Sequence, residues 1–497
     1  MGASKYKKVR NEERSSGVVS AREAAAQEAQ KAQKKTRTLT IVGIAALVLL
    51  TVAVILINSS FFDTRCAALK IGDTSYSAAE VRYAKQTAYN NFLNSYGELA
   101  GYFLDTSAPL DEQSCTFNPE ISWDQYFLEQ GIDYLKQTTA LYNAAKAEGR
   151  TLSEEDAAVI ESNMNMIGLY ASAYGYSVDG YIAALYGEGN SEKTMRSMME
   201  RSLVASAYAA EKSEEFSSSF TDAELEEYYK ENRDSYSTVS YLTAQLPFET
   251  DEEGNPVSEE EKTAAKASAD AILAACDGTA ESFRAAVLAE TGAEAIESGS
   301  VISNAGDASE WFASAERKEG DVTSVEESTC YRVYCYQSFD DNTYKTVSAR
   351  HILVQVVDAD EDGIFSDEEK QGAKETIEAI RDEWDGTEEN FIELVGKYSE
   401  DPGSVDNGGL YENIYHNQMV PEFNDFVFSG AKSGDSAIVY GESSSYAGYH
   451  LVYFVGEGDT YAHVLSRNAL SDEAFSSWQE ELMNGYEPEQ AFMFRYV

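Results

Sequence analysis

The feature that most constrains this chain is an internal repeat of roughly 110 residues in its C-terminal half. The segment at 238–248, TVSYLTAQLPF, aligns with the segment at 346–356, TVSARHILVQV. Further on, ESFRAAV aligns with ENFIELV, and YRVYCY aligns with YHLVYF. Each copy begins with a strand pattern, continues with apolar residues at helical spacing, and ends in two strand patterns. We therefore expect two domains of one α+β fold, at 236–345 and 346–457.

A second constraint lies near the N-terminus, where residues 38–58 contain no charged side chain. As a helix, the apolar part Leu39–Ile57 spans about 28 Å, enough to cross a bilayer. The preceding segment, 1–37, has ten Lys or Arg against four Asp or Glu. The positive-inside rule therefore predicts a cytoplasmic segment at 1–37, a single membrane anchor at 38–58 and an extracytoplasmic remainder. A cleaved signal peptide is the alternative, but no small-x-small site follows the apolar run.

The rest of the chain is strongly acidic, because the net charge is −48 although the first 37 residues are basic. This balance argues against binding to nucleic acid, which needs a basic surface. A solvated surface that keeps an extracytoplasmic protein soluble explains the charge. The five cysteines show neither metal-ligand nor CxxC spacing, so they indicate no zinc or redox site.

Between the apolar run and the repeats, residues 67–235 have mostly helical periodicity and are rich in Tyr, Ala and Met. We expect a helical domain here. The stripe Met195, Met198 and Met199 is better explained by core packing than by a methionine surface that binds polypeptides. The tail at 458–497 contains one more predicted helix, and packing of this tail on the helical domain is a hypothesis.

The two copies differ in their polar residues. His351 lies in the first strand of copy two and His450 in its last, where copy one has Thr243 and Arg332. A duplicated fold needs its core in both copies, so a polar pair found in one copy points to activity rather than to folding. The competing explanation is that the histidines merely satisfy each other or the backbone. The sequence has no nucleophile motif and no glycine-rich phosphate loop, so covalent catalysis is not indicated.

Four ordered motifs of copy two carry a resemblance to a known family. They are RHILV, KYSEDPGSVDNGGL, NQMVPEFNDFVF and GYHLVYF. In this order they resemble the parvulin-type (PpiC) peptidyl-prolyl isomerase domain. With the anchor, the helical region and DAELEEYYKEN, the whole chain is similar to the PrsA/SurA-type extracytoplasmic foldases. The resemblance implies an antiparallel sheet with helices, isomerisation of X-Pro bonds, and unfolded or newly exported polypeptides as clients.

The resemblance also implies roles for single residues. His351 and His450 would be paired central histidines that hold each other's tautomer. Asp401 would lie close to the substrate amide, where it either acts electrostatically or shapes the pocket. No cofactor is needed for such a reaction. The residues that would wall the proline pocket, with ordinary core packing as the alternative, are Leu410, Met419 and Phe423.

Some positions depart from the family pattern. Copy one lacks both histidines and the NQMVPEF motif, so we expect it to be a parvulin-like domain without isomerase activity that binds or spaces. In copy two, Ala447 replaces a small hydroxyl residue that some members have. The two remaining histidines of the chain, His416 and His463, are predicted to be exposed.

Residues 358–369, DADEDGIFSDEE, match the spacing of a calcium-binding loop. Carboxylates occupy positions 1, 3, 5 and 12 of the pattern, and a glycine occupies position 6. A predicted strand precedes this segment instead of a helix, and acidic turns in an acidic protein match by chance. A structural calcium ion and a simple acidic turn therefore both stay open. The calcium ligands would be Asp358, Asp360, Asp362, Ile364 through its carbonyl, and Glu369.

Taken together, these features predict a membrane-anchored, extracytoplasmic peptidyl-prolyl isomerase and foldase for exported proteins. The alternative is a holdase chaperone without catalysis, in which the helical region and copy one bind unfolded chains and copy two is vestigial. A third hypothesis is a surface protein that uses the repeats as spacers.

Overall fold

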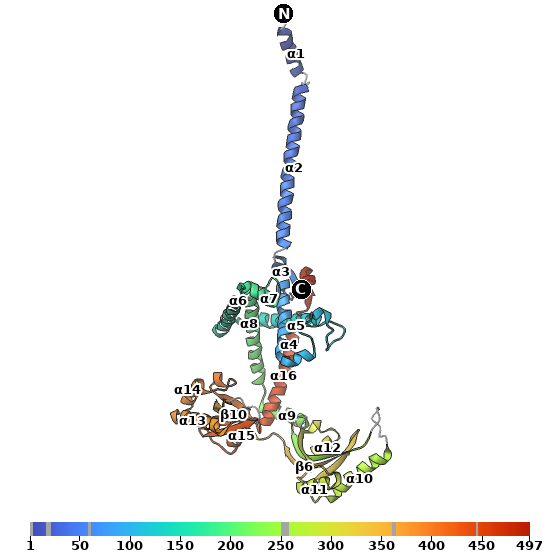
Figure 1. The fold of residues 1–497 in the computed structure, drawn as a ribbon, viewed down its shortest axis with the longest axis vertical. Coiled ribbons are helices and arrows are strands. Elements are labelled where there is room, and N and C mark those ends of the chain that lie inside the picture. The colour runs from blue at the N-terminus through green and yellow to red at the C-terminus, as the bar shows by residue number, and fades with distance from the viewer. Residues whose placement is uncertain (1–2, 16–20, 58–60, 250–257, 360–363, 444–445) are drawn as a thin grey trace. The chain divides into compact units, whose positions relative to one another are not determined.

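The computed structural model contains two compact units, one formed by Met1–Ser213 with Ser476–Val497 and the other by Glu214–Phe475 (Figure 1). The first unit is mostly helical, and the second holds two four-stranded antiparallel sheets. This confirms the predicted α+β multidomain architecture with antiparallel sheets. The structure describes residues 3–15, 21–57, 61–249, 258–359, 364–443 and 446–497.

The chain begins with two helices, α1 (Ala3–Ser15) and α2 (Ala21–Ile57). Within α2, the 20-residue segment Gln33–Val52 is long and apolar enough to cross a membrane, with a mean hydropathy of 1.6. Its apolar side chains are exposed, as the 69% exposure of Leu49 illustrates. It is the single candidate span among the residues that the structure describes.

The helical unit is organised by side-chain caps and a methionine-containing core. Ser77, Ser122 and Ser153 each accept a hydrogen bond from the backbone three residues on, which starts α4, α5 and α6. Met195 and Met198 are buried, so core packing is confirmed for these two methionines. The elements are α3 (Phe61–Arg65), β1 (Ala67–Ile71), β2 (Thr74–Ser77), α4 (Ala78–Tyr96), α5 (Trp123–Ala147), α6 (Glu154–Ala173), α7 (Val178–Tyr186) and α8 (Glu192–Ser217).

The end of the chain packs on this helical unit. Strand β11 (Pro488–Gln490) pairs antiparallel with β1 and forms a sheet of order β11-β1-β2. In the last turns of α16 (Tyr461–Met483), Trp478 and Leu482 pack against a cluster that contains Leu141 and Tyr208. Tertiary burial of these apolar side chains holds the tail in place.

The second unit begins with α9 (Asp222–Asn232) and contains both repeats. Their sheets have equivalent strand orders, β4-β3-β6-β5 and β8-β7-β10-β9. The first repeat has β3 (Thr238–Pro247), α10 (Glu259–Ala275), α11 (Ala280–Thr291), β4 (Ile296–Val301), α12 (Ser309–Ala313), β5 (Val322–Glu326) and β6 (Cys330–Asp340). The second has β7 (Lys345–Gln355), α13 (Asp367–Glu383), α14 (Glu388–Tyr398), β8 (Leu410–Ile414), α15 (Pro421–Phe428), β9 (Ser436–Ser443) and β10 (Tyr446–Thr460).

As far as the second helix of each repeat, burial recurs at a spacing of 108 positions, the spacing that separates 238 from 346. Phe283 of α11 and Phe391 of α14 are both 0% exposed. In each repeat, two amphipathic helices cover one face of the sheet with such residues. In the second repeat, α15 packs on the opposite face through Phe423 and Val427.

The repeats diverge after their second helix. Four residues, 292–295, connect α11 to β4, whereas eleven residues, 399–409, connect α14 to β8. The longer connection contains Asp401 and Ser404. The second repeat therefore has a longer, polar loop between α14 and β8.

Candidate functional site

Two histidines from neighbouring strands meet in the second repeat. His351 of β7 lies opposite Val452, two residues after His450 on β10, so both side chains lie on the face that α15 covers. Their Nδ1 atoms are 3.0 Å apart, and both residues are buried, at 4% and 7% exposure. The predicted pair is thus in direct hydrogen-bond contact.

The partners of each ring determine which nitrogen carries the proton. His351 Nε2 lies 2.7 Å from Asp401 Oδ2, a carboxylate oxygen that only accepts, so Nε2 donates. In a neutral ring, Nδ1 of His351 then accepts from Nδ1–H of His450. His450 Nε2 in turn accepts from the hydroxyl of Tyr446, at 2.7 Å. The hydrogen bonds therefore run in one direction, from Tyr446 through both histidines to Asp401.

Asp401 is the end of this network and accepts from several donors. Its Oδ2 accepts from the hydroxyls of Ser404 at 2.5 Å and Tyr411 at 3.1 Å, and Oδ1 accepts from Gly403 N–H at 3.1 Å. The hydrogen bond from His351 is the main reason that the pKa of Asp401 lies far below its usual value, although burial opposes the shift. Asp401 is therefore ionised throughout the physiological pH range.

At the other end of the network, His450 and Tyr446 each have a fixed protonation state. Burial, assisted by the proximity of His351, lowers the pKa of His450 to about 3, so this ring is neutral. Burial also raises the pKa of Tyr446 to about 12, so its hydroxyl stays protonated. The negative charge of the network resides on Asp401.

The network forms one wall of a cavity of about 300 Å³. Met419, Val420 and Phe423 form an apolar wall of the same cavity. The Phe423 ring stands nearly perpendicular to both imidazoles, with centroids 5.9 Å from each. Such a cavity suits a small apolar ring that carries an adjacent polar group, with the polar group facing Asp401.

The predicted site residues lie together here, with one exception. His351, Asp401, His450, Met419 and Phe423 all line the cavity. The lining does not include Leu410, and the next residue of β8, Tyr411, takes part instead. Successive side chains of a strand point to opposite faces, so only one of these two neighbours can face the cavity.

The sequence interpretation missed three residues of this site, Ser404, Tyr411 and Tyr446. Tyr446 lies four positions before His450 in one strand, a spacing that places both on the same face, so this pattern offered a signal. Ser404 lies three positions after Asp401 in a Pro-Gly turn, where short polar side chains bond to one another. The sequence held no comparable signal for Tyr411.

The candidate calcium loop lies only partly within the described residues. Asp358, Ile364 and Glu369 are described, whereas Asp360 and Asp362 lie outside the described residues. Glu369 accepts from the backbone and hydroxyl of Ser366, at 2.8 and 2.9 Å, in a capping box that starts α13. No group of three His, Cys, Asp or Glu side chains placed to hold a metal occurs among the described residues. The calcium site stays a prediction.

The prediction that His416 and His463 are exposed is wrong, because both are half-buried. The ring of His416 stacks on Tyr344, with centroids 3.6 Å apart and planes 8° from parallel. His416 also donates its backbone N–H to the hydroxyl of Tyr344. The stacking partner, Tyr344, lies 72 positions away in sequence, so no local pattern predicts this contact.

The fold and the site define a parvulin-type domain. Residues 332–456 match the family model described as PPIC-type PPIase domain, and this segment contains every residue of the network. The predicted membership of the second repeat in this family is confirmed.

Similarity to curated proteins agrees with this assignment. The chain is 32% identical over 146 residues to Chaperone SurA of Pseudomonas fluorescens (strain Pf-5), which covers 27% of this chain and 31% of that protein. The chain thus spans about a third of the length of the curated relatives it matches. Solved PrsA structures are also similar. The Bacillus subtilis protein is 11% identical, over 76% of this chain and 91% of that chain, with a TM-score of 0.29. The Bacillus anthracis protein is 25% identical, over 29% and 60%, with a TM-score of 0.18.

Proposed function

We propose that the second repeat isomerises X-Pro peptide bonds in the cavity beside Asp401. One observation carries the proposal. A directed chain of hydrogen bonds ends on an ionised carboxylate at one wall of a small cavity, and apolar side chains, including Met419 and Phe423, form the other wall.

The ionised carboxylate favours rotation for an electrostatic reason. A planar peptide bond owes its barrier of about 18–20 kcal/mol to resonance, which places negative charge on oxygen and positive charge on nitrogen. A negative group close to the carbonyl oxygen disfavours this charge separation and so weakens the partial double bond. The charge of Asp401 is in place before the substrate binds, because its donors already orient it.

The apolar wall has a different task. Met419 and Phe423 would hold the proline ring and exclude water, so that the charge of Asp401 acts in a medium of low dielectric. No bond is made or broken, so neither a nucleophile nor a cofactor is needed. The two histidines are positioning residues in this scheme. His351 holds Asp401 through a hydrogen bond, and His450 is neutral, so it adds no positive charge that would offset the charge of Asp401.

For the whole chain, we propose an extracytoplasmic foldase that the α2 helix anchors in a membrane, with unfolded, newly exported polypeptides as clients. The apolar span Gln33–Val52 and the basic residues before it support the anchor. The similarity to Chaperone SurA supports the clients. A holdase without catalysis is the second candidate, favoured by the apolar side chains that α6 exposes, such as Leu169 at 73%.

The test is the cis/trans exchange rate of a short X-Pro peptide, measured by NMR with the full chain in detergent. Asp401→Asn keeps a hydrogen-bond acceptor but removes the charge, and we expect exchange to slow about tenfold. Asp406→Asn, an exposed carboxylate in the same loop, is the matched control and should leave the rate unchanged. Equal rates for wild type and Asp401→Asn would contradict the electrostatic role. A folded wild-type chain that suppresses aggregation without catalysis would favour the holdase.

A further inference from the structure

Strand β3 of the first repeat has an open edge near its end. Strand β6 follows β3 as far as Pro247, but β4 pairs with β3 only as far as Thr243, which lies opposite Ile296. Backbone groups alternate in direction along a strand, and Phe248 donates its N–H to Thr329 on the β6 side. Gln245 and Pro247 therefore turn their backbone groups toward the side that β4 has left. No described residue pairs with Gln245 on that side.

The second repeat closes the same edge with its own chain. Leu353 and Gln355 hold the places of Gln245 and Pro247, 108 positions later. Leu353 N–H donates to Ser399 Oγ at 3.2 Å, and Glu400 N–H donates to the Leu353 carbonyl at 3.0 Å. Gln355 N–H donates to the Glu400 carboxylate at 2.6 Å. The first residues after α14 thus satisfy the backbone groups of this edge, with one backbone and two side-chain hydrogen bonds.

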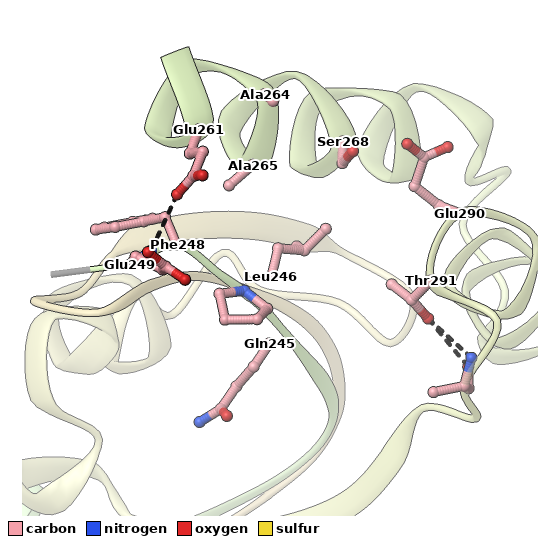
Figure 2. A pocket seen from close by; sticks show the side chains of 12 residues that line it. Gln245, Leu246, Phe248, Glu249, Glu261, Ala264, Ala265, Ser268, Glu290 and Thr291 are labelled. Carbon is pink, nitrogen blue, oxygen red and sulfur yellow. Dashed lines mark hydrogen bonds between the residues drawn. The ribbon is translucent and has the colours of Figure 1, made fainter. Parts of the chain in front are cut away.

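In the first repeat, the shorter connection after α11, residues 292–295, supplies no such segment, and a cavity of about 690 Å³ lies there among the described residues. Figure 2 shows this cavity between α10 and the end of β3. Leu246 and Phe248 supply apolar surface from the strand, and Ala264 and Ala265 supply it from α10. An extended chain would find both unpaired backbone groups and an apolar wall here.

The charged residues that line this cavity have one sign. Its described lining residues include the glutamates Glu249, Glu261 and Glu290, and no lysine or arginine. Glu261 is engaged with the backbone of Glu249, whereas the carboxylate of Glu290 is exposed at the end of α11 (Figure 2). The cavity therefore complements a segment that carries lysine or arginine beside apolar residues.

We propose that the first repeat binds an extended, basic and apolar polypeptide segment as an added strand on the free edge of β3. The identification of this segment as part of an unfolded client rests on the proposed foldase role, but not on isomerisation. One residue of the segment would exchange two hydrogen bonds with Gln245, and another would donate to the Pro247 carbonyl. Pro247 has no N–H, so the added strand stays short and binding is reversible.

Binding of a labelled, proline-free peptide that alternates lysine and valine tests this inference by fluorescence anisotropy, with the full chain in detergent. The peptide should bind at least about tenfold more tightly than the matched glutamate and valine peptide. Hydrogen exchange of the Gln245 amide should be fast in the free protein and slow on binding.

Two tryptophan variants on one helix provide the structural control. Ala264→Trp fills the cavity from an exposed position and should weaken binding at least about tenfold. Ala267→Trp adds the same side chain at an exposed position of α10 outside the lining, and should bind as wild type does. Unchanged binding by folded Ala264→Trp would overturn the inference, as would a Gln245 amide already protected in the free protein.

The outcome is separable from the proposed catalysis. A proline-free peptide is no substrate for isomerisation, and Ala264→Trp should leave X-Pro exchange unchanged. Peptide binding without catalysis would retain the inference and contradict the isomerase. Protection of Gln245 that grows with protein concentration instead of peptide would show that a second copy of this chain takes the edge, and would overturn it.

Discussion

In the second repeat, His351 and His450 are joined by a hydrogen bond, whereas the first repeat has Thr243 and Arg332 at these places. Thr243 donates its hydroxyl to the backbone carbonyl of Val333, at 2.9 Å, and Arg332 forms an ion pair with Glu327. No hydrogen bond joins Thr243 to Arg332 in the described part of the chain. Thr243 and Arg332 thus each have a partner within the first repeat. The sheet of this repeat has the equivalent strand order without a hydrogen-bond network between these two positions. The histidine pair is therefore not a requirement of this fold.

A second difference explains why the pair occurs with a cavity. The eleven-residue connection of the second repeat supplies Asp401 and Ser404 to the network, and Ser399 and Glu400 to the edge of β7. The four-residue connection of the first repeat supplies neither. One insertion thus builds a polar site and closes a strand edge, and its absence removes the site and opens the edge.

The shared core gives the largest expected effect. Phe283→Ala and Phe391→Ala each remove a fully buried ring, which should reduce the free energy of unfolding of the corresponding repeat by about 3–5 kcal/mol. Denaturant unfolding followed by hydrogen exchange in each repeat measures both losses. Only Phe391→Ala should also reduce X-Pro exchange. A first repeat that tolerates Phe283→Ala would show that the two cores are not equivalent.

The polar positions should behave differently. His450→Ala leaves His351 Nδ1 and the Tyr446 hydroxyl without their partner, at about 1–3 kcal/mol for an unsatisfied buried group. We expect X-Pro exchange to fall roughly tenfold to a hundredfold. Arg332→Ala changes the equivalent place of the first repeat and should leave exchange unaltered. Equal effects of the two variants, measured by NMR, would break the distinction between the repeats.

The sequence was a good guide to what both repeats share and to the residues that the family motifs carry. Phe283 and Phe391 recur at one spacing because burial at each position demands an apolar side chain. Leu410 lies outside the cavity lining because it and Tyr411 are neighbours on β8, and successive side chains of a strand point to opposite faces. Tyr446 shares a strand face with His450, a local pattern that the interpretation overlooked, whereas Tyr411 joins the site through the register of β8 with β7, which no local pattern encodes.

The network also predicts how stability depends on pH. Burial lowers the pKa of His450 from 6.5 to about 3, so between these values the unfolded chain holds a proton that the folded domain lacks. This contribution to stability is complete above pH 6.5 and is lost as the pH falls toward 3. His450→Gln removes this contribution. As the pH falls, the free energy of unfolding of the variant should therefore decrease less steeply than that of the wild type. The difference in slope is at most about 1.4 kcal/mol per pH unit, which corresponds to one proton.

Urea unfolding of the second repeat across this pH range measures the two slopes. His463→Gln, at a half-buried histidine outside the network, is the control for the loss of a histidine elsewhere in the chain. Parallel curves for wild type and His450→Gln would mean that His450 is not held neutral, and the direction of hydrogen bonds from Tyr446 to Asp401 would then be wrong.

The smallest expected effect lies where the repeats are still alike. Thr279 starts α11 and Thr387 starts α14, and each accepts from the backbone three residues on. Asp277 and Asp385 hold these threonines in the same way, with Oδ1 accepting from the hydroxyl at 2.7 and 2.6 Å. Threonine to alanine should therefore reduce stability by about 1 kcal/mol in either repeat, measured by exchange of the first-turn amides. Equal losses of stability would indicate that the two repeats differ only after α11 and α14. A larger loss at Thr387 would mean that the long connection already strains the helix from which it departs.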